Sequence, residues 1–204
     1  MKVITTVVGE LGTNCYLFFD ETSRLAALVD PADSPDELAA IIARENVQLR
    51  YILLTHGHRD HTFAAPAMHE RFPEAEVYIH RLDASGSGIY HYPLEGVIDG
   101  LKYYGEGDKL PLDPLTIEVM HTPGHTAGGV TLKVGDALFV GDTLFAGSFG
   151  RTDLPGGDTS EMFASLRRLG RLEGDYTVYP GHMDRTTLAR EKQFNPYLRM
   201  ALQK

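Results

Sequence analysis

The sequence contains a single cysteine, Cys15, and no tryptophan. One cysteine cannot form an intramolecular disulfide, and a metal site in this chain must therefore use imidazoles and carboxylates rather than several thiolates. The chain also lacks the ~20 consecutive apolar residues of a membrane-spanning helix. Its first residues show no apolar run followed by a small-residue cleavage site. These absences predict a cytoplasmic protein that does not enter a membrane.

Positive charge is also scarce, with 19 lysines and arginines against 28 aspartates and glutamates, a formal net charge of −9. This excess of negative charge repels phosphate backbones and anionic lipid surfaces, so we expect neither nucleic acid nor membrane as a partner. An anionic substrate would need local cations or metal ions. With 204 residues, 43% of them apolar, the chain is expected to form one domain spanning 1–204.

The order of predicted elements indicates two similar halves. Three β-rich runs open the chain and predict an antiparallel meander, and Ser34-Pro35-Asp36-Glu37 predicts a capped helix that reaches about Asn46. A second capping motif, Asp158-Thr159-Ser160-Glu161, predicts a helix through Leu169. The segment 83–107 lacks periodicity and is expected to be a mobile surface loop. The remaining patterns predict strands at 3–8, 15–19, 25–29, 51–54, 76–79, 115–120, 129–134, 137–140 and 176–179, and helices at 64–72, 187–192 and 196–202. Strands and helices recur in the same theme, which predicts two sheets packed face to face with helices outside, an α+β sandwich.

A histidine cluster follows one of the buried strands directly. Thr55-His56-Gly57-His58-Arg59-Asp60-His61 places three imidazoles and a carboxylate within six positions. In extended backbone, side chains two residues apart face the same way, so His56 and His58 can converge on one ion. The turn at Asp60 and His61 then points toward a second ion. Neutral imidazoles and carboxylates suit Zn, Fe or Mn.

Three further residues are candidate metal ligands because each follows a predicted strand and has a glycine directly before it. These are His125 in His121-Thr122-Pro123-Gly124-His125-Thr126, Asp142 in Val140-Gly141-Asp142-Thr143, and His182 in Tyr179-Pro180-Gly181-His182. A carboxylate such as Asp142 can bridge two metal ions, and water held between the ions becomes a nucleophile near neutral pH. The residues therefore predict metal-dependent hydrolysis.

In this order the motifs resemble those of the metallo-β-lactamase superfamily. Within it, 121–126 and the segment from Gly141 to Asp153 most resemble the glyoxalase II branch, the hydroxyacylglutathione hydrolases. The resemblance covers almost the whole chain and implies a four-layer αββα sandwich, the metallo-β-lactamase fold. It further implies two divalent ions, with Zn expected first and Fe or Mn as alternatives, and a small-molecule thioester substrate such as S-lactoylglutathione.

The same resemblance divides the ligands between the two ions. It implies His56, His58 and His125 for one ion. For the other it implies Asp60, His61 and His182, with Asp142 shared by both. Asp60 and Asp142 are the residues that it implies for catalysis, Asp60 by steering the attacking hydroxide.

Other functions of a similar site stay open at this point. About two dozen residues follow His182, which matches the short, single-domain glyoxalase II-like group. The sister persulfide dioxygenases share a Gly-Arg-Thr-Asp segment, and their mononuclear iron site would correspond to His56, His125 and Asp142. Hydrolysis of a lactone or another ester by the same residues is a third hypothesis.

Several residues have both a functional and a structural interpretation. Arg151 is the candidate for binding an anionic substrate group, although Asp153 offers it an internal salt bridge. Thr55 and Thr143 are candidates to support metal ligands by hydrogen bonds. The structural interpretation is preferred for His69, His80, His91, His121, for the tyrosines at 90, 92, 103 and 104, and for the thiol of Cys15.

Overall fold

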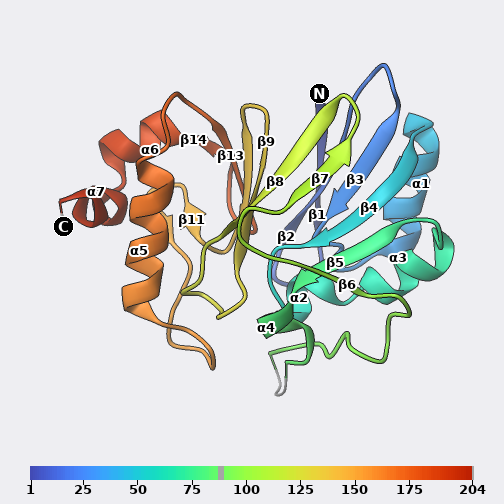
Figure 1. The fold of residues 1–204 in the computed structure, drawn as a ribbon, viewed down its shortest axis with the longest axis horizontal. Coiled ribbons are helices and arrows are strands. Elements are labelled where there is room, and N and C mark those ends of the chain that lie inside the picture. The colour runs from blue at the N-terminus through green and yellow to red at the C-terminus, as the bar shows by residue number, and fades with distance from the viewer. Residues whose placement is uncertain (87–89, 204) are drawn as a thin grey trace.

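Two six-stranded sheets, each mixing parallel and antiparallel pairs, face each other in the computed structural model, which describes residues 1–86 and 90–203 (Figure 1). The first sheet has the order β1 (Lys2–Val8), β2 (Thr13–Phe19), β3 (Leu25–Val29), β4 (Gln48–Leu54), β5 (Glu76–His80), β6 (Lys102–Tyr104). The second has the order β14 (Thr186–Thr187), β13 (Thr177–Pro180), β10 (Ala137–Gly141), β9 (Val130–Val134), β8 (Leu115–His121), β7 (Lys109–Leu112). A separate hairpin joins β11 (Leu144–Phe145) to β12 (Ser148–Phe149).

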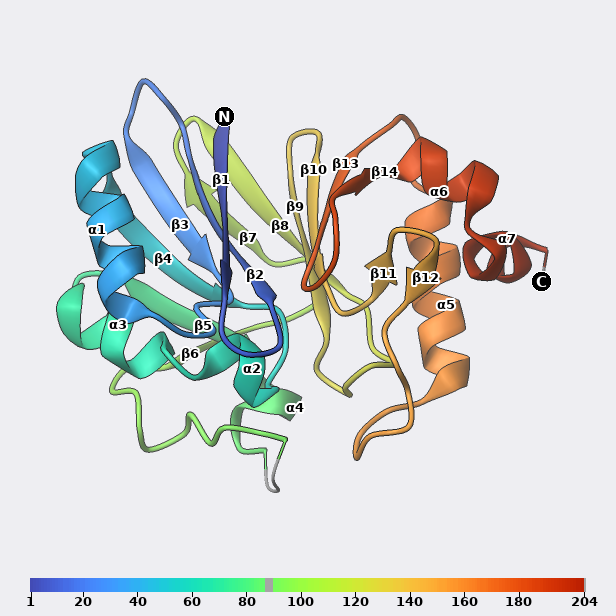
Figure 2. The ribbon, with the colours of Figure 1, turned by 180° about the vertical axis from the view of Figure 1, so that it is seen from behind.

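Helices cover the outer face of each sheet (Figure 2). Helices α1 (Pro35–Glu45) and α3 (Ala65–Arg71) lie on the first sheet, whereas α5 (Thr159–Gly170) and α7 (Pro196–Leu202) lie on the second. The short helices are α2 (Arg59–Thr62), α4 (Arg81–Ala84) and α6 (Leu188–Phe194). No helix in the described part of the chain is long and apolar enough to cross a membrane.

The apolar strands explain this layering, because their alternate side chains enter different cores. In β2, Leu17 and Phe19 pack toward the helices of the first sheet, while Tyr16 and Phe18 pack between the sheets. Phe18 stacks on Phe139 of β10 with ring centroids 4.8 Å apart. Burying a side chain of this size stabilises the fold by about 1.5–3 kcal/mol. A third core lies between the second sheet and its helices, which confirms the predicted αββα sandwich.

The start of α1 differs from the prediction. The helix begins at Pro35, as expected, but the Ser34 side chain makes no capping hydrogen bond. Ser34 instead has a left-handed backbone with φ of 54°, and its N–H donates to the carboxylate of Asp33. The second capping motif forms as predicted, since Asp158 Oδ1 accepts a hydrogen bond of 2.9 Å from the Glu161 N–H.

The segment 83–107 is more ordered than its composition predicts. Strand β6 adds to the edge of the first sheet, and Leu94, Ile98 and Tyr104 are buried in the cores. The prediction of a surface loop is wrong for these residues, because a three-residue strand and isolated apolar anchors leave no periodic pattern. Residues 87–89 lie outside the described part of the chain.

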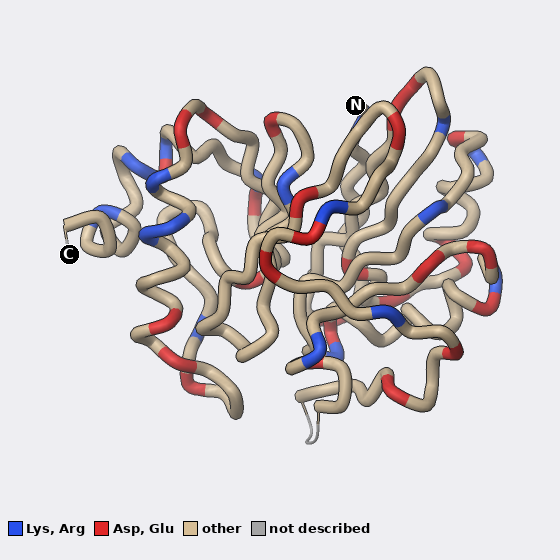
Figure 3. Tube along the Cα trace, viewed as in Figure 1, with Lys and Arg blue, Asp and Glu red and all other residues tan. Residues whose placement is uncertain are grey.

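Charged residues occur along both halves of the chain trace, with acidic and basic residues interspersed (Figure 3). Strands β3, β4, β8, β10 and β13 end close to one another, at Val29, Leu54, His121, Gly141 and Pro180. The polar residues that follow these strand ends form the candidate site.

Candidate metal centre

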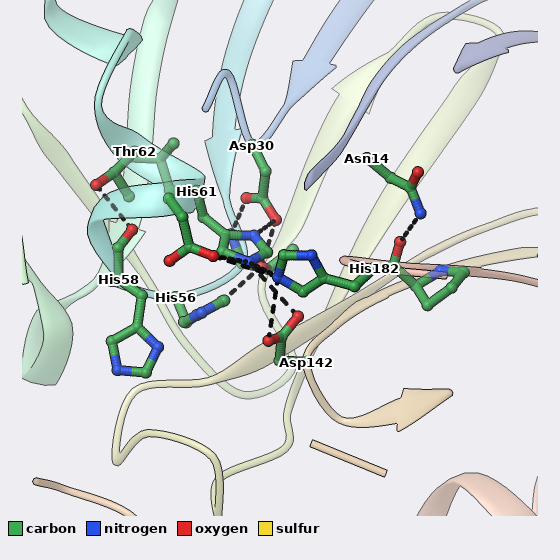
Figure 4. A network of polar contacts seen from close by, with 12 residues as sticks. Asn14, Asp30, His56, His58, His61, Thr62, Asp142 and His182 are labelled. Atoms are coloured by element: carbon green, nitrogen blue, oxygen red, sulfur yellow. Dashed lines mark hydrogen bonds and ion pairs between the residues drawn. The ribbon is translucent and has the colours of Figure 1, made fainter. Parts of the chain in front are cut away.

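The histidines and carboxylates predicted as ligands converge at this edge of the sandwich. Figure 4 labels His56, His58, His61, Asp142 and His182 among them. The loop and helix α2 after β4 carry His56, His58, Asp60 and His61. Loops after β8, β10 and β13 of the second sheet carry the other three predicted ligands, His125, Asp142 and His182. The site therefore lies on the boundary between the two sheets, and both sheets contribute side chains to it.

One group of donors consists of His56, His58 and His125, whose ligand atoms lie within 4.8 Å of one another. His58 Nδ1 is 2.8 Å from His125 Nε2. All three residues are buried, with exposed fractions of 2%, 3% and 5%. Among the described residues, nothing hydrogen-bonds to Nε2 of His56 or Nε2 of His58. A buried polar atom without a partner is costly, so Nε2 of His56 favours a bound cation, whereas His58 faces His125 through Nδ1.

A second group consists of Asp60, His61 and His182, again with ligand atoms within 4.8 Å of one another. His61 Nε2 lies 3.3 Å from His182 Nε2. His182 Nε2 lies 3.2 Å from Asp60 Oδ2. This group is more accessible than the first, since the side chains of Asp60 and His182 are 29% and 21% exposed.

Asp142 lies between the two groups. Its Oδ2 is 3.5 Å from His125 Nε2 in the first group and 3.7 Å from His182 Nε2 in the second. Its Oδ1 is 3.5 Å from His61 Nε2 and is buried without a hydrogen-bond partner among the described residues. One carboxylate thus faces donors of both groups.

The donor sets fit divalent metal ions. Two Zn–N bonds of about 2.0–2.1 Å at a tetrahedral angle hold their nitrogens about 3.3–3.4 Å apart. The separation of 3.3 Å between the His61 and His182 nitrogens matches this value, whereas the 2.8 Å between His58 and His125 is shorter. Imidazole and carboxylate donors also suit Fe and Mn.

Burial keeps two imidazoles of the first group, His56 and His58, neutral. It is the main cause that lowers the pKa of His58 to about 3, with the neighbouring His125 adding to the effect. Burial and the neighbouring His61 also hold the pKa of His56 well below its usual range. A neutral imidazole is the form that binds a metal ion.

Carboxylates have the opposite effect in the second group. Burial disfavours a charge on His61, but Asp142 and Asp30 outweigh it and raise the pKa of His61 to about 9. The pKa of His182 is also raised, because a hydrogen bond to Asp60 and the charge of Asp142 outweigh burial. The pKa of Asp60 lies well below its usual range, since its contacts with His182 and His61 outweigh its own burial.

Asp30 is a functional residue that the sequence interpretation missed. Its Oδ2 lies 2.9 Å from His61 Nδ1 and accepts a 2.6 Å hydrogen bond from the Thr55 hydroxyl. Its Oδ1 accepts from the Thr55 N–H at 2.7 Å. Asp30, His56 and His61 also lie close enough to form a donor group. Both oxygens of Asp30 are already used in these hydrogen bonds, so we assign Asp30 to orienting His61 rather than to binding a metal ion. Its place directly after the buried strand β3 is the signal that could have identified it.

Asp83, also missed, fixes the backbone around the histidines. Its carboxylate accepts hydrogen bonds from the Gly57 N–H, the Thr126 hydroxyl and the Gly128 N–H, at 2.9, 2.7 and 2.7 Å. Gly57 lies between two predicted ligands, and Thr126 follows a third. Nothing in the local sequence around Asp83 indicates this role, because its partners lie 26 to 45 residues away.

The turn that carries His182 is held from the other sheet. The Asn14 amide donates to the carbonyls of Pro180 and Met183 at 3.0 and 2.8 Å, and the Tyr16 hydroxyl donates to Pro180 at 2.6 Å. Gly181 is required here, because a Cβ would lie 2.2 Å from Asp142 Oδ1.

The other candidates divide between supporting and structural positions. Thr55 Oγ1 is 3.1 Å from His56 Nδ1, as expected of a supporter, whereas the hydroxyl of Thr143 contacts Thr122 at 3.4 Å and touches no ligand. Arg151 donates to both oxygens of Asp153 at 2.7 Å, and its backbone carbonyl lies 2.7 Å from His125 Nδ1.

Two of the histidines interpreted as structural keep that role, and a third lies closer to the site than expected. His80 and His121 stack on each other with ring centroids 4.5 Å apart. His91 forms a β-bridge with His58, and their ring centroids are 4.9 Å apart. The thiol of Cys15 is buried, and burial raises its pKa well above the usual range, which fits an unreactive thiol.

The sandwich and its imidazole–carboxylate cluster define a metal-dependent hydrolase, and comparison with known proteins agrees. A family profile described as the metallo-β-lactamase superfamily matches residues 8–182. The chain belongs to this superfamily. It is 33% identical to the hydroxyacylglutathione hydrolase GloC of Haemophilus influenzae over 97% of this chain and 98% of that protein.

Solved structures give the same fold. TTHA1623 in a di-iron-bound form has a TM-score of 0.82 and 35% identity, covering 96% of this chain and 100% of that one. ETHE1 from Myxococcus xanthus has a TM-score of 0.82 and 29% identity, covering 99% of this chain and 90% of that one.

Proposed function

We propose that this hydrolase cleaves acyl thioesters, with S-lactoylglutathione as the representative substrate and two metal ions in its site. The observation that carries the proposal is the second donor group, which Asp142 joins to the first. The similarity to a hydroxyacylglutathione hydrolase over almost the whole chain supports the substrate class. In the reaction, water adds its oxygen to the acyl carbon, the carbon–sulfur bond breaks, and a carboxylic acid and a thiol are released.

The roles of the residues follow from their positions. His56, His58 and His125 would hold one ion and Asp60, His61 and His182 the other, with Asp142 contacting both. Bound divalent ions would supply Lewis acidity toward the acyl carbonyl and toward water.

Asp60 is the residue we assign to orienting the attacking water. Its low pKa keeps it ionised at neutral pH, so it accepts hydrogen bonds and donates none. Its partial exposure leaves it open to the substrate side of the centre. Asp30 and Asp83 position the loops and do not contact the reacting atoms.

Two other functions use overlapping residues. A persulfide dioxygenase with one iron on His56, His125 and Asp142 is supported by the similarity to ETHE1, and His125 and Asp142 do lie 3.5 Å apart. A lactone or ester hydrolase would use both donor groups. The dioxygenase would leave the second group without a role, which is why we favour the hydrolase.

One set of measurements separates these functions. Protein produced with both Zn and Fe supplied would be analysed for metal content and assayed with S-lactoylglutathione, simple acyl thioesters, lactones and, by oxygen uptake, glutathione persulfide. We expect two equivalents of metal and metal-dependent release of thiol. One equivalent of iron with oxygen uptake would replace the proposal by the dioxygenase. Lactone turnover without thioester turnover would replace the substrate class.

A further inference from the structure

A cavity of about 350 Å³ adjoins Asp60 on the open side of the metal centre. It lies between the β1–β2 hairpin, the loop after β3, and the start of α2. Three large apolar residues line it, and Leu11, Phe63 and Tyr90 are 70%, 42% and 44% exposed. Exposed apolar side chains gathered at a cavity next to a catalytic centre are typical of a surface that contacts a ligand.

Arg59 supplies the only positive side chain of this cavity. Its N–H donates to the Tyr90 carbonyl at 2.7 Å, which fixes the backbone at the cavity wall. Its guanidinium lies over the Phe63 ring, 4.3 Å from the ring centroid. No carboxylate in the described part of the chain forms an ion pair with it, and residues 87–89 are Ser, Gly and Ile.

Arg151, the sequence-based candidate for substrate binding, differs from Arg59 because it is already paired with a carboxylate. Both of its donors to Asp153 are at 2.7 Å, the paired geometry in which an arginine fork is already satisfied. A substrate anion would have to displace Asp153 to bind there. Arg59 can bind an anion without breaking an ion pair.

We propose that Arg59 binds a carboxylate of the substrate. Arg59 would then select thioesters that carry a carboxylate on the part of the substrate that occupies this cavity. The inference rests on the proposed thioester hydrolysis for the nature of the bond that is cleaved. Stacking on Phe63 orients the guanidinium before the substrate arrives, which lowers the entropy cost of binding.

Acidic residues of the same cavity limit the charge of this substrate. Glu10, Asp33 and the proposed ligand Asp60 line it together with Arg59. Several negative charges on this part of the substrate, as in a diphosphate, would exceed the one positive charge of Arg59 and be repelled by the carboxylates, whereas Arg59 can neutralise a single carboxylate. The substrate class is therefore a thioester with a single carboxylate on this part, and not a polyphosphorylated thioester.

A matched pair of substrates tests this proposal. S-acetyl-N-acetylcysteine and S-acetyl-N-acetylcysteamine differ only by one carboxylate. We expect kcat/KM of the metal-loaded protein to be about tenfold higher for the carboxylate compound, through KM, because a hydrogen bond between two charged groups is stronger than a neutral one but is weakened where the site is exposed to solvent. Arg59→Gln should remove the preference, lowering kcat/KM about tenfold for the first compound and leaving that of the second nearly unchanged.

Two control variants accompany Arg59→Gln. Arg59→Lys keeps the charge and should retain part of the preference. Arg199→Gln, on α7 at the far side of the second sheet, should leave the ratio between the two substrates unchanged. Equal kcat/KM for both substrates in the unmodified protein, equal losses in Arg59→Gln, or loss of the preference in Arg151→Gln would each overturn the proposal.

Binding of uncleavable analogues separates this inference from the reaction. The S-propyl thioethers of N-acetylcysteine and N-acetylcysteamine would be titrated by calorimetry. If neither thioester is hydrolysed but the carboxylate thioether binds about tenfold more tightly, and only while Arg59 is present, the proposed reaction fails and the role of Arg59 stands. If the two thioethers bind equally, or neither binds, the role of Arg59 is wrong.

Discussion

The two donor groups of the centre differ in composition and in exposure. The first group has three imidazoles, all buried, and no carboxylate of its own. The second has a carboxylate and two imidazoles, and two of its three side chains are partly exposed. The pKa of His58 in the first group is lowered to about 3, whereas that of His61 in the second is raised to about 9.

This difference means that protons would compete with the second ion more strongly than with the first. At neutral pH the first group has His56 and His58 neutral and ready to bind an ion. In the second group a proton held by His61 must leave before its nitrogen can bind a metal. We therefore expect the first ion to be held tightly and the second to exchange more readily with solvent.

The largest effect is expected from removing the residue that joins the groups. Asp142→Ala should lower thioesterase activity at least a thousandfold and reduce metal content in both groups, because both lose the same carboxylate. Metal analysis and thiol-release assays on the purified variant would measure this. Full loading with two ions would contradict the shared position of Asp142.

Single-group variants should separate the ions. His182→Ala should lose mainly the second ion and retain about one equivalent, because the first group keeps all its imidazoles. His56→Ala is the matched variant in the first group and should impair the tightly bound ion. The measurement is metal content after dialysis against a weak chelator. If both variants retain the same ions, the division into two groups is wrong.

Asp30 offers a test of the second group that leaves every ligand in place. Asp30→Asn removes the charge next to His61, and we expect about 10–100-fold weaker binding of the second ion with little change for the first. Competition with a metal-binding dye would give both affinities. Asp99→Asn, an exposed position outside the site, is the control. Equal weakening of both ions would indicate general loosening of the fold.

The smallest effect is the dependence on pH. The pKa of His61 is raised to about 9 and that of His182 is also raised, so at least one proton leaves for each ion bound below pH 9. Affinity for the second ion should therefore rise at least about tenfold per unit from pH 6 and level off near pH 9. The first ion should show a much shallower slope, since His56 and His58 are already neutral. Parallel slopes for the two ions would remove the distinction between the groups.

The proposed ligands could be predicted to lie together from the sequence, whereas the residues that support them could not, for a physical reason. Metal ligands occur in short motifs at strand ends, so His56 to His61 and the Gly-His and Gly-Asp pairs could be recognised locally. Asp30 and Asp83 act on residues far along the chain, and only the packing of both sheets reveals their partners. The capping hydrogen bond of the Ser34 side chain was predicted from residue type, but Ser34 has a left-handed backbone and its own N–H donates to the carboxylate of Asp33.

The αββα layers could be predicted because β2 and β10 are apolar on both faces. Strand β6 could not be predicted, since three residues carry no measurable periodicity. Substrate selection is similarly hidden, because Arg59 and Arg151 are equivalent as residue types. Only the pairing of one with Asp153 distinguishes them.

The amide of Asn14 and the hydroxyl of Tyr16 cross from the first sheet to the turn before His182. The proposed ligands also come from both sheets, so a bound ion would link the two sheets. An ion that binds only the folded protein stabilises it by about 2.7 kcal/mol when its free concentration is a hundred times its Kd. Melting temperature should consequently rise with the supply of metal and fall when a chelator removes it.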